Sequence, residues 1–183
     1  KICNHFHIPL QSGSNKILKL MGRRYEREYY RELILSIHDR IPEAAFAADV
    51  MVGFPGEEDR DFWDSYELLE GLPLLDLHVF KYSRRPGTRA AELFPQVDEK
   101  ARQERSDLLL RLAERKKEQF AQGFMGKKLT VLVERKVKEG LYSGISDNYL
   151  DILVPAAHNI CAQFVQVTLY RDNNGQIIGK LEN

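Results

Sequence analysis

The chain has 183 residues, of which 43% are hydrophobic and 30% are charged, and its 27 basic side chains balance its 27 acidic ones. This composition is typical of one medium globular domain, or of a modest domain with a small second one, and no apolar run approaches the ~20 residues of a membrane-spanning helix. The neutral balance gives no sign of a nucleic-acid partner at the level of the whole chain, so RNA binding must come from local patches. No export signal is visible at the N-terminus, which predicts a cytoplasmic protein.

The first two thirds of the chain alternates strand and helix patterns. Crossovers of this length between strands imply parallel, right-handed βαβ units. The expected elements begin with a strand over 5–10, a short helix capped by Ser14, and a helix from about Arg27 to just before Pro42. A strand over 45–53, buried on both faces, and a helix burying Phe62, Tyr66 and Leu69 follow. The last two elements are a strand over 77–82 and a charged, largely solvated helix over about 98–122.

The last third of the chain has a different pattern. After Gly123 it consists of short β-rich runs separated by Gly, Asn and Asp turns, which is typical of a small antiparallel barrel. The clearest runs cover 128–134, 149–155, 164–170 and 177–182. The sequence therefore predicts two domains, over residues 1–123 and 124–183.

The two cysteines carry little information about chemistry. Cys3 and Cys161 are too far apart in the sequence for a Cys-x-x-Cys metal or redox motif, and we interpret them as unrelated free thiols. No Gly-x-Ser-x-Gly, Walker or His-Glu-x-x-His motif marks a catalytic group. The sequence thus predicts no catalytic residue and no metal ligand set.

Three polar stretches follow the three strands predicted in the α/β part. They are 11–13, 53–57 and 82–88, and each combines glycine with hydrogen-bonding side chains. A plain Pro-Gly turn explains the second and third stretches equally well. Because the carboxyl ends of parallel strands are where α/β folds gather functional groups, the coincidence of all three favours a binding site.

Three further polar residues lie within the predicted strands. His5 and His7 share one side of a strand, where hydrogen-bonded histidines inside a barrel and metal ligands are both possible. Asp49 lies near the end of a buried strand, so it needs a partner or lines a polar cavity. Structural support is the simpler interpretation for it.

The strand-end motifs carry a family resemblance. HFHIPLQSGSNKILKLMGRRY (5–25), DVMVGFPGEEDRDF (49–62) and HVFKYSRRPGTRAA (78–91) together resemble the carboxyl-terminal half of the radical S-adenosylmethionine (radical SAM) methylthiotransferases. The tail resembles the TRAM domain, an RNA-binding barrel that closes those enzymes. The resemblance implies an α/β fold, the partial (βα) half of a radical SAM TIM-like barrel, followed by a small antiparallel β-barrel (TRAM).

The resemblance also implies a transferase that acts in tRNA modification. The third motif looks most like the branch that adds a methylthio group to C2 of N6-threonylcarbamoyladenosine at tRNA position 37, in the anticodon stem-loop. The branch that modifies isopentenyladenosine at the same position remains an alternative, as does a non-catalytic RNA-binding module. The expected enzyme is a radical SAM methylthiotransferase.

The family resemblance further implies that this chain is a fragment of a longer protein. The full-length parent is expected to use S-adenosyl-L-methionine and two [4Fe-4S] clusters, each held by three cysteines. Neither cysteine set is present, and one iron–sulfur cluster needs three thiolates to leave an open iron for the cofactor. The chain alone is therefore expected to be inactive and to bind no cofactor stoichiometrically.

Carried over residue by residue, the motifs imply two groups of binding residues. The cofactor-binding group is Gln11, Ser12, Arg23, Gly53, Phe54, Tyr82 and Ser83. The RNA-binding group is Arg84, Arg85, Lys127, Lys128, Arg135, Lys136, Lys138, Asn148 and Tyr149, of which the five in 127–138 are expected around one hairpin. For the members of the second group in 127–149, the alternative is a charged barrel rim that only packs against the first domain.

Two positions depart from the family pattern. Glu26 replaces a threonine that caps a helix well, and Gly22 replaces a residue that is often basic.

A half barrel leaves an open sheet edge, which predicts self-association through that edge. The expected partners are tRNA and further copies of the chain, with no membrane.

Overall fold

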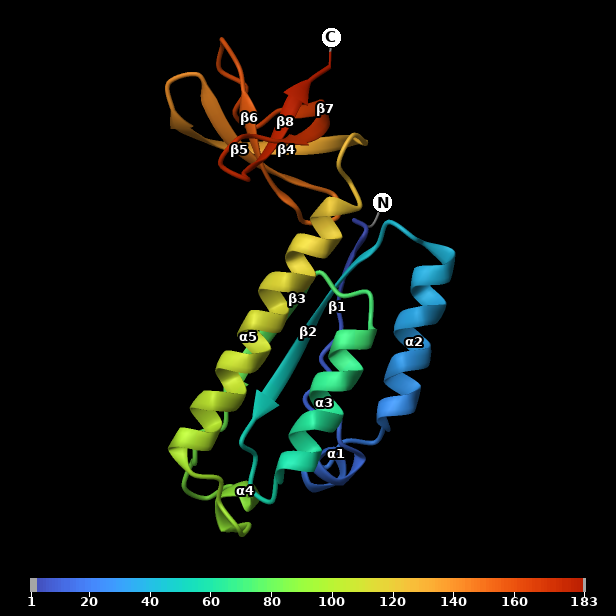
Figure 1. The fold of residues 1–183 in the computed structure, drawn as a ribbon, viewed down its shortest axis with the longest axis vertical. Helices are drawn as coiled ribbons and strands as arrows, with labels where there is room; N and C mark the ends of the chain where they lie inside the picture. Colours follow the sequence, from blue (N-terminus) through green and yellow to red (C-terminus); the bar gives the residue numbers. More distant parts are fainter. Residues whose placement is uncertain (1–2, 183) are drawn as a thin grey trace. The chain divides into compact units, whose positions relative to one another are not determined.

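The computed structural model describes residues 3–182, which form two compact units (Figure 1). The α/β unit runs from Phe6 to Lys117. The barrel unit consists of the described residues up to His5 together with those from Glu118 onward. Helix α5 (Glu99–Gln122) therefore contributes residues to both units.

The α/β unit is built on a three-stranded parallel sheet with the order β1-β2-β3. Strand β2 (Ala45–Val52) pairs with β3 (Asp76–Lys81) from Ala47 opposite Asp76 to Val52 opposite Lys81. Strand β1 (His5–His7) is short, but the chain stays beside β2 as far as a parallel bridge between Gln11 and Val50. The predicted parallel α/β arrangement is confirmed.

The helices of this unit begin close to where the sequence predicts them. Ser14 caps α1, and Glu26 precedes α2 without a capping hydrogen bond from its side chain, as expected of its departure from threonine. Helix α4 was not expected. The helices are α1 (Asn15–Leu20), α2 (Arg27–Arg40), α3 (Asp59–Gly71), α4 (Arg89–Glu92) and α5.

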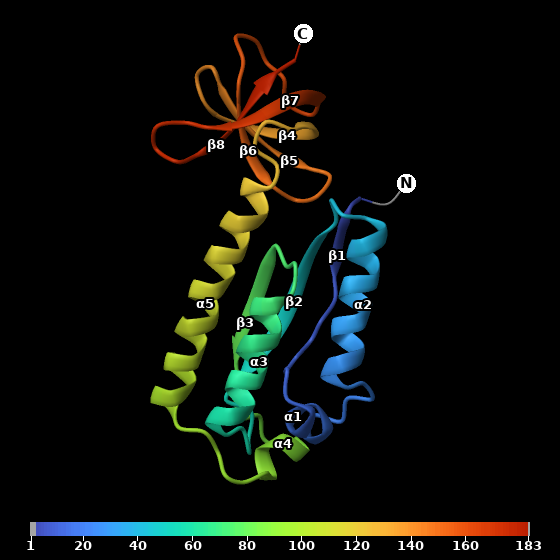
Figure 2. The same ribbon diagram turned by 45° about the vertical axis from the view of Figure 1, so that its right-hand side comes forward.

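One face of the sheet is packed against long helices (Figure 2). Phe46, Ala48 and Val50 of β2 join a buried apolar cluster with side chains of α2, α3 and α5. The prediction that β2 is buried on both faces is wrong near its end, because Asp49 and Met51 on the other face are only half-buried. That second face is therefore where polar and ligand-binding side chains can lie.

Helix α5 is less solvated than its charge predicts. Arg105 and Lys116 are both 7% exposed. Arg105 pairs with Glu57 and Asp59, while the Lys116 ammonium donates hydrogen bonds to the carbonyl groups of Glu70 and Leu72. The interpretation of the charged side of α5 as a solvated face is thus wrong at these two cations, which tie α5 to α3 and its neighbouring loops.

The barrel unit is a closed five-stranded barrel with the order β4-β5-β6-β8-β7. Its strands are β4 (Lys128–Lys138), β5 (Leu141–Ser146), β6 (Asp151–Pro155), β7 (Phe164–Arg171) and β8 (Ile177–Leu181). The predicted small barrel is confirmed, but it is mixed rather than antiparallel, because β6 and β8 run parallel where Leu153 faces Ile178. Strand β5 was not predicted as a separate strand. Its Gly144 is required, since a Cβ there would lie 2.4 Å from the Leu132 carbonyl oxygen.

The open sheet of the α/β unit leads to a prediction about association. Among the described residues β1 and β3 each have one neighbouring strand, and Phe80 on β3 is 51% exposed. Unpaired strand edges bind further strands, so we expect the average mass to rise with concentration in light scattering. A constant monomer mass over a roughly hundredfold dilution series would contradict this expectation.

Candidate functional site

The carboxyl ends of the three strands meet at one edge of the sheet. The Gln11 N–H donates to the Asp49 carbonyl at 2.8 Å, and the Met51 N–H donates to the Gln11 carbonyl at 2.9 Å. On the other side of β2, the Tyr82 N–H donates to the Val52 carbonyl at 2.9 Å. The three polar stretches that the sequence singles out are therefore neighbours in space.

Two pockets lie at this edge, with volumes of about 280 and 400 Å³. They share Met51, Phe54 and Ala90, so they adjoin one another. The smaller pocket is lined in addition by Gln11, Leu20, Met21, Gly22, Arg23 and Arg89. The larger pocket is lined in addition by Phe80, Lys81, Tyr82, Ser83, Arg85 and Thr88.

Five residues of the predicted cofactor group line these pockets: Gln11, Arg23, Phe54, Tyr82 and Ser83. Gln11 has a φ of 70°, a left-handed conformation that a residue with a side chain adopts only at an energetic cost. Such strained residues cluster at ligand sites, where the surrounding structure holds them in place. Here the two backbone hydrogen bonds between Gln11 and β2 hold it beside the smaller pocket.

Tyr82 supplies a buried polar atom without a partner. The residue is 7% exposed, and its ring packs edge-on against Phe54 with 5.5 Å between the centroids. Its hydroxyl group is buried and makes no hydrogen bond to any described residue. Because an unpaired buried hydroxyl is costly, a ligand with a polar atom in the larger pocket would be favoured.

Two other residues of the predicted cofactor group line neither pocket. Ser12 is 1% exposed, and its Oγ lies 3.4 Å from Ser65 Oγ and accepts from the Ser14 N–H. Gly53 has a φ of 73°, and a Cβ there would lie 2.1 Å from Cγ of Arg102. The described contacts of both residues hold the turns that follow β1 and β2.

A buried ion pair supports the loop after β2 and was missed by the sequence analysis. Glu57 Oε1 accepts from the Gly53 N–H at 2.8 Å and from Arg105 Nη1 at 2.6 Å. Burial raises the pKa of Glu57, although the Gly53 hydrogen bond and the Arg105 charge partly oppose the rise. Because Arg105 lies 48 residues further along the chain, local patterns could not have indicated this pair.

On the less covered face of the sheet, a cluster joins all three strands. Asp49 Oδ1 lies 2.7 Å from His7 Nε2 and 3.1 Å from His78 Nδ1, and the two imidazole rings meet edge-on. The donor atoms lie within 4.8 Å of one another and are of kinds that Zn²⁺ binds, so these residues could hold a metal ion. The hydrogen bonds between them give Asp49 the partner that the sequence required.

The two arginines of the predicted RNA group in the α/β unit differ in their contacts. Arg84 Nε donates to the Ala91 carbonyl at 3.0 Å and so supports the turn before α4. Arg85 is exposed and lines the larger pocket. Arg85 is therefore better placed than Arg84 to meet a ligand outside the pocket.

The five basic residues predicted around one hairpin form two groups instead. Lys127 and Lys128 lie at the start of β4, and Arg135, Lys136 and Lys138 lie towards its other end. Roughly 23 Å of extended strand separate the two groups. The second group alone flanks the β4–β5 hairpin, so the prediction of one cluster is wrong.

The last two residues of the predicted RNA group lie in the turn after β5. Asn148 is buried, and its Oδ1 accepts from Ser146 Oγ at 2.6 Å, which makes it a structural part of the turn. Tyr149 remains half exposed and stacks on His5 with 4.0 Å between the ring centroids. Only Tyr149 of the two presents its side chain to solvent.

The residues present suit an organic ligand better than an iron–sulfur cluster. Both cysteines of the chain are free thiols, and two thiolates are one short of the three that a [4Fe-4S] cluster with an open iron requires. The pockets instead offer an amide, a guanidinium, a hydroxyl without a partner and an aromatic wall. These groups fit a ligand that carries a carboxylate, hydroxyl groups and an aromatic ring.

Comparisons with known proteins show which enzymes the chain is similar to. Residues 1–69 match the family model of the radical SAM superfamily. The chain is 34% identical over 191 residues to the threonylcarbamoyladenosine tRNA methylthiotransferase MtaB of Bacillus subtilis, covering 100% of this chain and 42% of that protein. It is 41% identical over 152 residues to MtaB of Aquifex aeolicus, covering 83% of this chain and 36% of that protein.

A second group of relatives carries a different name. The chain is 35% identical over 183 residues to the tRNA-2-methylthio-N(6)-dimethylallyladenosine synthase of Natranaerobius thermophilus, covering 99% of this chain and 41% of that protein. Within residues 3–182, no helix has both the length and the apolar character needed to cross a membrane. The chain is homologous to the radical SAM methylthiotransferases, and it spans about two-fifths of the length of the relatives that it matches.

Proposed function

We propose that this chain is the carboxyl-terminal part of an enzyme that adds a methylthio group to C2 of N6-threonylcarbamoyladenosine at position 37 of tRNA. The observation that carries the proposal is the pair of adjoining pockets at the strand ends. Gln11, Arg23, Phe54 and Tyr82, all expected from the family motifs, line these pockets together. Since tRNA is modified in the cytoplasm, the proposal also places the protein there.

The pockets form one side of a cradle for S-adenosylmethionine in this proposal. When bound, S-adenosylmethionine supplies the radical chemistry and the methyl group. The Arg23 guanidinium, which makes no ion pair within residues 3–182, is suited to the carboxylate of the cofactor. Gln11 and the Tyr82 hydroxyl offer hydrogen bonds, and Phe54 offers an apolar wall to the adenine. Ser12 and Gly53 then act by holding the turns that carry these groups.

The clusters must be held by other parts of the enzyme. Because Cys3 and Cys161 cannot supply a three-thiolate site, we propose that the cluster ligands lie in a longer protein of which this chain is a part. On its own the chain is then inactive. Its own residues bind and orient the cofactor and the RNA.

The barrel unit is proposed to act as a TRAM-like RNA-binding domain. Support comes from the exposed cations flanking the β4–β5 hairpin and from the half-exposed ring of Tyr149. Exposed cations suit the RNA backbone, and an exposed aromatic ring suits the bases of an RNA loop. The partner would be the anticodon stem-loop of tRNA.

A second substrate is favoured by a specific observation. The relative named as a tRNA-2-methylthio-N(6)-dimethylallyladenosine synthase matches the chain over nearly the same length and at nearly the same identity as MtaB of Bacillus subtilis. The dimethylallyl (isopentenyl) substrate therefore stands as the alternative to threonylcarbamoyladenosine. A non-catalytic RNA-binding module would explain the barrel but not the pocket residues.

Solution NMR of the chain with millimolar S-adenosylmethionine tests the cofactor proposal. We expect amide shifts centred on Gln11, Arg23, Phe54 and Tyr82, because a half cradle binds weakly but locally. Gln11→Ala should reduce these shifts, whereas Gln119→Ala, an exposed position on α5, should leave them unchanged. Shifts that are absent, or that ATP reproduces equally well, would contradict the proposal.

A further inference from the structure

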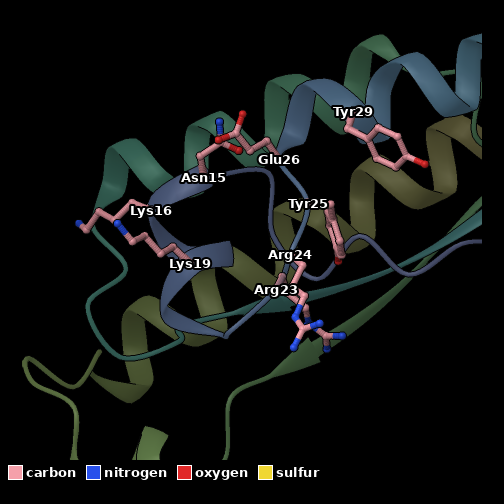
Figure 3. A pocket seen from close by; sticks show the side chains of 8 residues that line it. All are labelled: Asn15, Lys16, Lys19, Arg23, Arg24, Tyr25, Glu26 and Tyr29. Atoms are coloured by element: carbon pink, nitrogen blue, oxygen red, sulfur yellow. The ribbon is translucent and has the colours of Figure 1, made fainter.

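A third pocket lies along α1 and the segment that leads into α2. It is an open groove of about 970 Å³, shown in Figure 3. Four of its lining residues are cations, whereas Glu26 is its single carboxylate. The lining residues are Asn15, Lys16, Lys19, Arg23, Arg24, Tyr25, Glu26 and Tyr29.

Three of the four cations make no ion pair with any residue that the structure describes. Lys16 lies 2.8 Å from Asp61 and 3.0 Å from Glu58. Lys19, Arg23 and Arg24 make no ion pair within residues 3–182. Figure 3 shows the guanidinium groups of Arg23 and Arg24 pointing the same way, an arrangement of like charges that an anion between or beside them would stabilise.

The floor of the groove is held in shape by polar contacts. Asn15 donates to Glu28 at 2.9 Å and accepts from the Arg27 N–H at 2.8 Å, which fixes α1 to the start of α2. The Tyr25 hydroxyl donates to the Leu10 carbonyl at 2.9 Å. These bonds join groups of the chain itself and fix the lining residues relative to one another, which lowers the cost of ordering them around a partner.

One wall of the groove ends in an aromatic side chain. Tyr29 is 61% exposed, and Figure 3 shows its ring at the end of the groove away from Lys16 and Lys19. Cations that follow a backbone, together with an aromatic ring on which a base or ribose can stack, are the pattern of proteins that bind single-stranded nucleic acid. A small free anion would need neither the length of the groove nor the ring.

The groove also adjoins the proposed cofactor pocket. Arg23 lines both the groove and the smaller strand-end pocket that contains Gln11 and Phe54. We propose that the groove binds the sugar–phosphate backbone of an RNA strand, and that this strand passes from the groove towards the strand-end pockets. The inference rests on the proposed function and adds a second RNA contact, on the α/β unit.

Binding of an anticodon stem-loop RNA by the whole chain tests this inference as a function of salt. The test variant is Lys19→Gln with Arg24→Gln, which leaves Arg23 and the strand-end pockets intact. The matched control is Lys100→Gln with Arg111→Gln, two exposed cations on α5. Losing two phosphate contacts should weaken binding roughly tenfold. It should also reduce the magnitude of the salt slope, the slope of log affinity against log salt concentration, by about 1.4.

The outcomes separate this inference from the proposed function. If the groove variant binds the RNA as tightly as the wild type and with the same salt slope, the inference that the groove binds RNA is overturned. The barrel would then be the RNA site. Absence of wild-type binding would overturn the groove as well, whereas cofactor shifts in NMR would survive it. A third measurement locates the RNA on the protein. A photoreactive group at Tyr29 should crosslink to the RNA more efficiently than the same group at position 63 on α3, which is the control. Equal crosslinking from the two positions would contradict the inference.

Discussion

Replacing Arg105 by Met is expected to lower the free energy of unfolding by about 3–5 kcal/mol near pH 7, since it leaves a buried carboxylate without its charge partner. Arg105 Nη1 lies 2.6 Å from Glu57 Oε1, and the Glu57 side chain is only 2% exposed. Urea unfolding followed by the fluorescence of Trp63, the one tryptophan of the chain, reports on the α/β unit. Arg111→Met, an exposed position on the same helix, is the control.

The loss in Arg105→Met should depend on pH in a definite direction. Burial raises the pKa of Glu57 in the folded protein, and removing Arg105 raises that pKa further. A carboxyl group whose folded pKa exceeds its unfolded pKa weakens the fold as pH rises through that interval. The destabilisation should therefore be larger at pH 8 than at pH 5. A loss that is equal at both pH values, or no larger than that of Arg111→Met, would contradict the buried-pair account.

Replacing Asp61 by Ala should cost about 3 kcal/mol, because one buried carboxylate serves three partners. Its oxygens accept from Ser14 Oγ at 2.7 Å, from Lys16 Nζ at 2.8 Å and from the Glu58 N–H at 2.9 Å. These bonds cap α3 and join it to α1. The same unfolding measurement applies, with the exposed Glu67→Ala on α3 as the control.

The pH dependence for Asp61 has the opposite sign. Burial acts to raise the pKa of Asp61, but Lys16, the Glu58 N–H and Ser14 together outweigh burial and lower it. A carboxylate with a lowered pKa stabilises the fold above its unfolded pKa of about 3.9, and this contribution is lost as pH falls through the folded value. The cost of Asp61→Ala should thus be full at pH 7 and shrink below about pH 4. A cost that grows on acidification would contradict this sign.

Sequence patterns predict the fold well where interactions between residues close in the sequence determine the structure. The cap at Ser14, the apolar periodicity of α2 and the alternation of Gly and Asn turns with short runs after Gly123 all correspond to observed elements. The prediction fails where contacts between residues far apart in the sequence determine the structure. The parallel pairing of β6 with β8 arises from barrel closure, and the burial of Arg105 arises from Glu57, which no local pattern of α5 encodes.

Some residues of the candidate site could likewise be predicted from local patterns, and others could not. Gln11, Phe54 and Tyr82 were predicted because they follow strands within recognisable motifs, and the structure brings them to adjoining pockets. Met51 and Arg89 were missed: a methionine inside an apolar strand looks like core, and Arg89 begins a helix of four residues that gives no periodic signal. His78 appeared only as part of a motif, because its pairing with Asp49 depends on the register between β2 and β3.

The most direct test of the proposed enzyme is a chimera in Bacillus subtilis. The region of MtaB that aligns with this chain is replaced by the chain, and the nucleosides of tRNA are analysed by mass spectrometry in a strain that lacks its own MtaB. We predict methylthiolated threonylcarbamoyladenosine in the chimera and its loss with Gln11→Ala, but not with Gln119→Ala. A chimera that folds and binds its clusters yet leaves threonylcarbamoyladenosine unmodified would contradict the proposed function.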